Sequence, residues 1–281
     1  MLDWWYWMVS LLLPFQWVEH TFMKNALLAV LLATPLFGIL GTMVVSSRMA
    51  FFSDSLGHGA FIGITIGTIV GGLSPLKGTI IFSVIFAIII TVIKNKSKTS
   101  PDTIIGVFAS TAVALGLVMM SFGGGFNKFS SFLIGDLLSI APLEIIMLFG
   151  VFVGVILLWL VIFNKLLIIS INPSLAGSRG INTLFIEILF SSVLAVVVAM
   201  TIHWVGLLMI NSLLVLPAAA ARNITINVRQ YHFVAVFSAI FSGVTGLILS
   251  YYLNSATGST IVLISAMLFF ATFTIRGRFV N

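Results

Sequence analysis

An aspartate and a histidine stand four residues apart at the start of an apolar stretch. They are Asp54 and His58, in the run Ser53-Asp54-Ser55-Leu56-Gly57-His58-Gly59-Ala60. In a helix this spacing places both side chains on one face, one turn apart. An ionisable side chain inside a bilayer costs at least about 3 kcal/mol, so two of them on one face suggest a shared ligand. Carboxylate plus neutral imidazole suits a transition metal such as zinc or manganese. The alternative is a mutual hydrogen bond without a metal, and two ligands alone do not complete a site.

Four glycines follow the pair on a neighbouring stripe of the same stretch. They are Gly59, Gly63, Gly67 and Gly71. Because glycine has no side chain, such a column allows another helix to pack backbone to backbone. The sequence therefore predicts one helix with a ligand-bearing face beside a tightly packed face.

The composition places these residues in a membrane protein. Of 281 residues, 60% are hydrophobic and 7% are charged, whereas soluble domains carry about 25% charged residues. The chain has no cysteine, which excludes disulfides and thiolate metal sites. The net charge of +6 comes from cations between apolar segments, so we expect no nucleic-acid partner.

Nine apolar segments predict an all-α, polytopic membrane helical bundle with about nine transmembrane helices. They are 24–45, 51–73, 77–93, 103–122, 142–163, 183–202, 204–221, 232–252 and 259–275. The sixth and seventh are separated only by His203 and Trp204. We treat residues 1–281 as a single transmembrane domain. Residues 1–22, which include an aromatic cluster, are expected to lie at the membrane interface.

The distribution of lysine and arginine predicts the orientation. Ten of these cations fall in the loops after odd-numbered segments, against three (Lys24, Lys77 and Lys128) on the other side. Cytoplasmic loops carry the excess of positive charge. We therefore expect an N-terminus outside and a C-terminus in the cytoplasm.

The longest expected cytoplasmic loop, 164–182, carries a helix signal of its own. Asn172 can cap a short helix that begins at Pro173, and a glycine can end it. Such a helix would lie on the cytoplasmic surface. It could be a docking element for a soluble partner or a plain connector.

Two other carboxylates and two absent motifs narrow the functional classes. We expect Asp102 to cap the fourth segment, and Glu187, one turn inside the sixth, could face an exit path. The chain has no G-x-x-x-x-G-K-[ST] phosphate loop and no H-E-x-x-H pair. It therefore does not bind ATP by that loop and is not a metalloprotease of that type.

Four motifs follow one another along the chain. They are Ser53–Ala60 after Arg48-Met49, Asp102–Gly106 with Ala114-Leu115-Gly116, Gly135-Asp136-Leu137-Leu138-Ser139-Ile140, and Val205-Gly206 through Leu213 to Arg222. Together, from about Phe15 to Ile275, they resemble the permease subunits of bacterial zinc/manganese/iron-type ABC importers. The chain departs from the family pattern at Gly57, where Ser or Ala is common, and at Gly59, usually Ala or Val.

The resemblance implies a metal-type ABC permease fold in the bacterial inner (plasma) membrane. It implies a transporter subunit rather than an enzyme, with ATP on a partner chain and no permanently bound cofactor. The expected cargo is Zn²⁺, with Mn²⁺ or Fe²⁺ as alternatives, and the expected partners are a second copy of the chain, two ATP-binding subunits and an extracytoplasmic metal-binding protein. A gradient-driven secondary metal carrier remains the alternative.

The resemblance also assigns roles to two sets of residues. Asp54 and His58 match the metal-coordinating pair of the translocation path. The segment that corresponds to the cytoplasmic coupling helix consists of Pro173, Ser174, Leu175, Ala176, Gly177, Ser178, Arg179 and Gly180.

Overall fold

All regular structure in the described part of the chain is helical. The computed structural model describes residues 2–12, 15–69, 74–122 and 135–276, and no β-strand occurs among them. The elements are α1 (Asp3–Leu12), η1 (Gln16–Glu19), α2 (Thr21–Ser46), α3 (Phe52–Ile69), α4 (Pro75–Lys96), α5 (Pro101–Phe122), η3 (Leu137–Ser139), α7 (Pro142–Ile171), α8 (Pro173–Ser178), α9 (Thr183–Val205), α10 (Leu207–Ile224), α11 (Val228–Leu253) and α12 (Thr257–Ile275).

Each of the nine apolar segments corresponds to one long helix. Seven helices within the described ranges are long and apolar enough to cross a membrane, namely α2, α4, α5, α7, α9, α11 and α12, and α10 contributes a shorter apolar stretch. The predicted all-α membrane bundle is confirmed. Within the described residues there are nine long helices, and seven of them meet the length and hydropathy of a full span.

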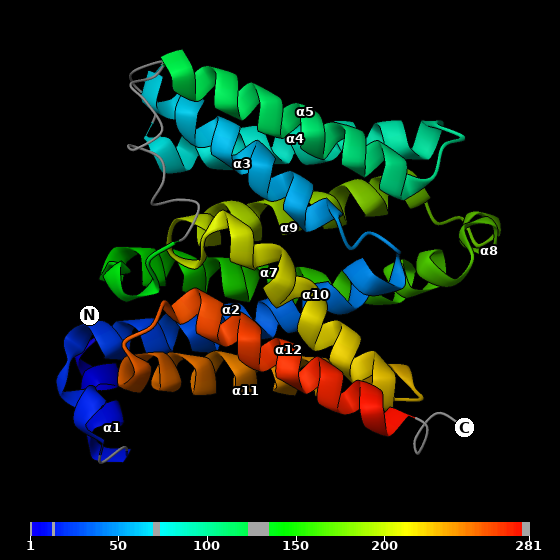
Figure 1. Ribbon diagram of the computed structural model, residues 1–281. Helices are drawn as coiled ribbons and strands as arrows, with labels where there is room; N and C mark the ends of the chain where they lie inside the picture. The colour runs from blue at the N-terminus through cyan, green and yellow to red at the C-terminus, as the bar shows by residue number, and fades with distance from the viewer. Residues whose placement is uncertain (1, 13–14, 70–73, 123–134, 277–281) are drawn as a thin grey trace.

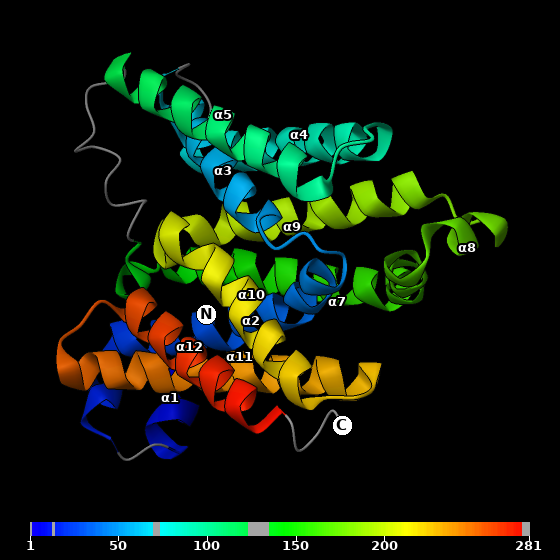
Figure 2. The same ribbon diagram turned by 45° about the vertical axis from the view of Figure 1, so that its right-hand side comes forward.

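The long helices lie in three groups (Figures 1 and 2). Helices α3, α4 and α5 form one side, α2, α11 and α12 form the other, and α7, α9 and α10 lie between them. The most apolar windows of α2 and α9 are 72% and 61% buried, against 22% for α5 and 17% for α12. The core therefore surrounds α2 and α9, whereas α5 and α12 offer most of their surface to lipid or to another chain.

The two ends of the bundle carry different elements. In Figure 1 the short helix α8 and the end of α12 lie at one end, and α1 lies at the opposite end. Helix α7 continues to Ile171, whereas the sequence placed the start of a loop at Asn164. The connection to α9 is correspondingly shorter than expected, because apolar residues in 164–171 continue the helical pattern of α7.

The boundary between α9 and α10 differs from the one expected at His203 and Trp204. Helix α9 runs through both residues to Val205, and the break falls at Gly206, whose φ is 89°. That backbone conformation favours glycine. A Cβ on Gly135 would lie 2.4 Å from the Gly206 nitrogen. The break is thus covered by protein backbone, which is where a membrane protein tolerates an interrupted helix.

The N-terminus of α5 is capped by a residue other than the one predicted. The backbone N–H of Thr103 donates to Ser100 Oγ at 3.3 Å, and Asp102 lies inside the first turn. The expectation that Asp102 caps the helix is therefore wrong. Its carboxylate still lies where it complements the helix dipole.

Candidate metal site

The first turn of α3 is fixed by contacts with α10. Ser53 Oγ donates a hydrogen bond to Asn211 Oδ1 at 2.6 Å. A Cβ on Gly57 would lie 2.5 Å from Leu207 Cδ1, so a side chain at this position would require Leu207 to move. These contacts hold the start of α3 against α10 on both sides of Asp54 in the sequence.

Asp54 and His58 form a partly exposed pair near the start of α3. His58 Nε2 lies 3.8 Å from Asp54 Oδ2, and the side chains are 24% and 39% exposed, respectively. Their neighbours Ser53 and Ser55 are fully buried. Because 3.8 Å is too long for a hydrogen bond, the mutual hydrogen bond considered as an alternative is not formed in this structure. Both side chains are partly exposed and so remain accessible to a ligand.

Two ligands are too few for a closed metal site. Among the residues that the structure describes, no group of three or more His, Cys, Asp or Glu side chains lies close enough to hold a metal. A zinc site needs three or four protein ligands, and manganese takes more oxygen ligands still. The metal role of Asp54 and His58 stays a prediction.

Gly63 lies where α3 approaches α4 most closely along the predicted stripe. A Cβ at this position would lie 2.8 Å from Thr79 Cα and 2.9 Å from the Gly78 carbonyl oxygen. Both atoms belong to the backbone of α4 and cannot move aside independently. The two helices therefore touch backbone to backbone at this level, as small residues allow.

The other members of the stripe meet different surroundings. A Cβ on Gly59 would lie 2.6 Å from the ring of Phe86, and one on Gly67 would lie 3.3 Å from Pro75 Cα. Gly71 lies outside the described residues. The packing role of the whole stripe remains a prediction, and among its described members the closest contact with the α4 backbone is at Gly63.

The helix signal in the 164–182 segment is confirmed at the level of local structure. The Asn172 side chain accepts hydrogen bonds from the backbone N–H groups of Ser174 and Leu175 at 3.0 and 3.2 Å. Pro173 is the first residue of α8. Gly180, with φ of 73°, turns the chain toward α9.

Helix α8 presents most of its residues to the outside. Ala176 is fully buried, whereas the remaining residues of 173–180 are exposed. The backbone N–H of Ile181 donates to the carbonyl oxygen of Ala176 at 3.1 Å. The segment is therefore held to the bundle by one small residue and leaves a free outer surface at the end of the molecule (Figure 1). Its coupling role stays a prediction.

The sequence model of the family described as "ABC 3 transport family" matches residues 19–276. The chain belongs to this family. The match spans all of the long helices and includes the pair on α3 and helix α8. It confirms the family expected from the ordered motifs.

Named relatives of this ABC 3 transport chain carry two different metals in their names. The chain is 30% identical to the manganese import system permease protein ScaB of Streptococcus gordonii, over 92% of this chain and 93% of that protein. It is 32% identical to the high-affinity zinc uptake system membrane protein ZnuB of Haemophilus influenzae, over 82% and 88% of the two chains. The solved structure of PsaBC from Streptococcus pneumoniae in complex with a Fab matches with a TM-score of 0.79 and 28% identity, covering 94% of each chain.

A second pair of ionisable residues in the ABC 3 chain was not paired in the sequence analysis. Lys94 Nζ of α4 lies 2.7 Å from Glu187 Oε2 of α9, with side chains 11% and 19% exposed. Asn95 Nδ2 donates to the same oxygen at 2.7 Å, and Lys94 Nζ also lies 3.6 Å from Met49 Sδ. The structure therefore gives Glu187 a structural partner, and nothing in its contacts supports the exit path suggested for it. The only signal in the sequence was that both charges stand near the ends of apolar segments.

Proposed function

We propose that this chain is the membrane-spanning permease of an ABC importer that moves a divalent transition metal into the cytoplasm. The observation that carries the proposal is the open Asp54–His58 pair on a helix fixed by α10, in a chain of the ABC 3 transport family. The relatives named for manganese and for zinc support the metal class. We take zinc as the first cargo to test, because imidazole suits zinc, and manganese or ferrous iron as the next.

The pair would act as a transient binding site rather than a permanent one. Asp54 offers a carboxylate oxygen and His58 an imidazole nitrogen, and both side chains are partly exposed. Conduction needs a site that binds strongly enough to accept the ion and weakly enough to release it. An incomplete and partly exposed ligand set meets that need, because water or a second chain can exchange for the missing ligands.

The remaining surfaces fit the partners of an ABC importer. Helices α5 and α12 are the least buried candidate spans, so a second copy of the chain could pack on them and add ligands. Helix α8, exposed at one end of the bundle, would contact one of two cytoplasmic ATP-binding subunits. A metal-binding protein would deliver the ion at the opposite end.

The first experiment is a pull-down of the tagged chain from its native membrane, followed by metal uptake by the purified assembly in proteoliposomes. We expect a stoichiometric ATP-binding subunit and uptake of zinc or manganese that requires ATP. The double variant Asp54→Ala, His58→Ala should assemble and lose uptake. The matched control, Asp102→Ala with His20→Ala, removes the same two residue types from exposed positions and should transport normally.

Two outcomes would overturn the proposal. Uptake by the chain alone without ATP would identify a secondary carrier. Normal uptake by the assembled Asp54→Ala, His58→Ala variant would show that these two residues are not the metal site. The proposal of an ABC importer would be unaffected by that result.

A further inference from the structure

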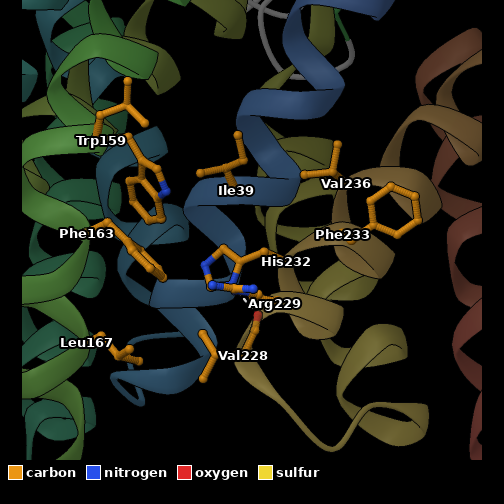
Figure 3. A pocket seen from close by; sticks show the side chains of 10 residues that line it. Ile39, Trp159, Phe163, Leu167, Val228, Arg229, His232, Phe233 and Val236 are labelled. Atoms are coloured by element: carbon orange, nitrogen blue, oxygen red, sulfur yellow. Dashed lines mark hydrogen bonds between the residues drawn. The ribbon is translucent and has the colours of Figure 1, made fainter.

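An apolar groove lies on the side of the bundle between α7, α11 and α2 (Figure 3). Its volume is about 660 Å³. It is lined by Ile39, Trp159, Leu160, Phe163, Leu167, Val228, Arg229, His232, Phe233 and Val236. Eight of these ten residues are apolar, so the groove can accept a hydrocarbon chain but offers few polar contacts.

Both ring nitrogens of His232, the histidine of the groove, already lie within hydrogen-bond distance of protein atoms. His232 Nε2 lies 2.9 Å from Thr42 Oγ1 of α2, and Nδ1 lies 2.9 Å from the carbonyl oxygen of Val228. Its ring also packs edge-on against Phe163 of α7, with 5.0 Å between ring centroids. His232 therefore joins the three helices that form the groove, and it has no ring nitrogen left for a ligand.

Arg229 is the remaining charged residue of the groove. It lies in the first turn of α11, is exposed, and is drawn beside His232 in Figure 3. None of the chain's seven Asp and Glu residues lines the groove. The guanidinium is therefore placed where an anion on the ligand would complement it, and guanidinium is the side chain that best matches phosphate.

The groove lies near the end of the bundle that carries the cationic loops. Apart from Ile39 of α2, its residues come from the second half of α7 and the first turns of α11, the halves of these helices that lead toward the end that bears α8. From Arg229 to Val236 the groove follows α11 for about 10 Å. Basic pockets between helices on the cytoplasmic side of a membrane are recognised by anionic lipid headgroups.

We propose that this groove binds an anionic phospholipid, with an acyl chain against the wall formed by α7 and α11 and the headgroup phosphate on Arg229. A bound lipid of this kind would bridge α7, which leads directly into α8, and α11. The site is separate from the Asp54–His58 pair, so the proposal does not rest on metal transport.

The test is native mass spectrometry of the full chain in detergent, titrated with phosphatidylglycerol or with phosphatidylcholine of the same acyl chains. We expect phosphatidylglycerol to bind more tightly to the wild type. Arg229→Gln should weaken phosphatidylglycerol binding about fivefold, the effect of one cation near a membrane surface, and should weaken phosphatidylcholine binding less, because the choline cation offsets the charge of the same phosphate. Arg276→Gln removes an exposed cation outside the groove and should change neither. Val236→Phe, which fills the groove, should weaken both lipids.

Three results would overturn the proposal. The first is equal binding of the two lipids by the wild type, and the second is equal behaviour of Arg229→Gln and Arg276→Gln. The third is cross-linking to a protein through a cysteine introduced in the groove. The chain has no cysteine of its own, so the Phe233→Cys variant carries the only thiol. A disulfide-linked dimer through that thiol, or its cross-linking to another polypeptide, would identify a protein as the occupant. Since Arg229 and Phe233 are exposed, neither variant is expected to impair folding.

Discussion

The Asp54–His58 pair and the Lys94–Glu187 pair differ in how closely their polar groups are matched by contacts within the bundle. Lys94 and Glu187 come from two helices, lie 2.7 Å apart and are joined by Asn95. Asp54 and His58 come from one helix, lie 3.8 Å apart and are more exposed. The charges of Lys94 and Glu187 are matched by contacts within the chain, whereas the Asp54 and His58 side chains remain accessible to a ligand.

This difference separates a structural pair from a binding pair. A nearly buried ion pair must be matched closely, because desolvation of the two charges has to be compensated by their own contacts. A pair that binds a passing ion must instead keep its lone pairs available. Four experiments would break or sharpen this distinction.

The largest effect is expected from Asp54→Asn, which keeps the shape of the side chain and removes its charge. Loss of a metal ligand should reduce uptake about 100-fold, while stability in detergent stays within about 0.5 kcal/mol because the side chain is 39% exposed. Radiolabelled metal uptake and thermal unfolding measure the two quantities. Asp102→Asn serves as the control. Equal uptake by both variants would show that Asp54 is not a metal ligand and has a structural role, like Glu187.

Acidification should weaken the open pair next most strongly. A protonated histidine cannot bind a metal, because both of its ring nitrogens then carry protons. Protons and metal compete for His58, so uptake should fall by up to about tenfold per pH unit on the acid side of its titration. Uptake at pH 7.5 and 5.5 measures the effect. The residual uptake of His58→Gln should depend less on pH, and an unchanged pH dependence would assign the titration to another group.

Glu187→Ala should lower the free energy of unfolding by about 3 kcal/mol. The substitution leaves the Lys94 ammonium, which is 11% exposed, without its carboxylate partner, and an uncompensated buried charge is strongly destabilising. Thermal unfolding in detergent tests this. The double variant Lys94→Ala, Glu187→Ala should recover part of the loss. If the single and double variants were equally stable, the unpaired Lys94 charge would not be the cause of the destabilisation. The contrast between the Lys94–Glu187 and Asp54–His58 pairs would then fail.

Gly63→Ala should cost about 2 kcal/mol of stability, because the added methyl group meets the α4 backbone. Gly106→Ala is the matched control, since no atom lies within 4 Å of its added Cβ. It should be neutral or slightly stabilising, as alanine favours a helix. Helix α4 carries Lys94 and packs on the helix of Asp54, so Gly63→Ala also tests whether the two pairs are mechanically linked. Equal stability of the two variants would show that α3 and α4 are not locked at this level.

The sequence predicted what depends on local pattern. Long apolar runs identified all nine long helices, and the Asn172-Pro173 signal predicted α8 with its cap. Spacing alone placed Asp54 and His58 on one face of α3. These features follow from hydrophobicity, helical geometry and backbone chemistry within a few residues.

The remaining features depend on contacts between distant segments. The bond of Asn95 to Glu187 spans 92 residues, and that of Ser53 to Asn211 spans 158. Neither has a local pattern that could identify it. The break at Gly206 was misplaced for a similar reason, because a loop glycine, Gly135, packs against it. One chain's sequence likewise says nothing about ligands that another chain would supply.

The length of α7 has a mechanical consequence. Its 30 residues make a rod of about 45 Å, whereas the hydrocarbon core of a bilayer is about 30 Å thick. Only Asn172 separates this rod from α8, so a displacement of the exposed helix would reach α7 through a single residue. A push on α8 would then act as a torque on α7 and tilt it as one rod.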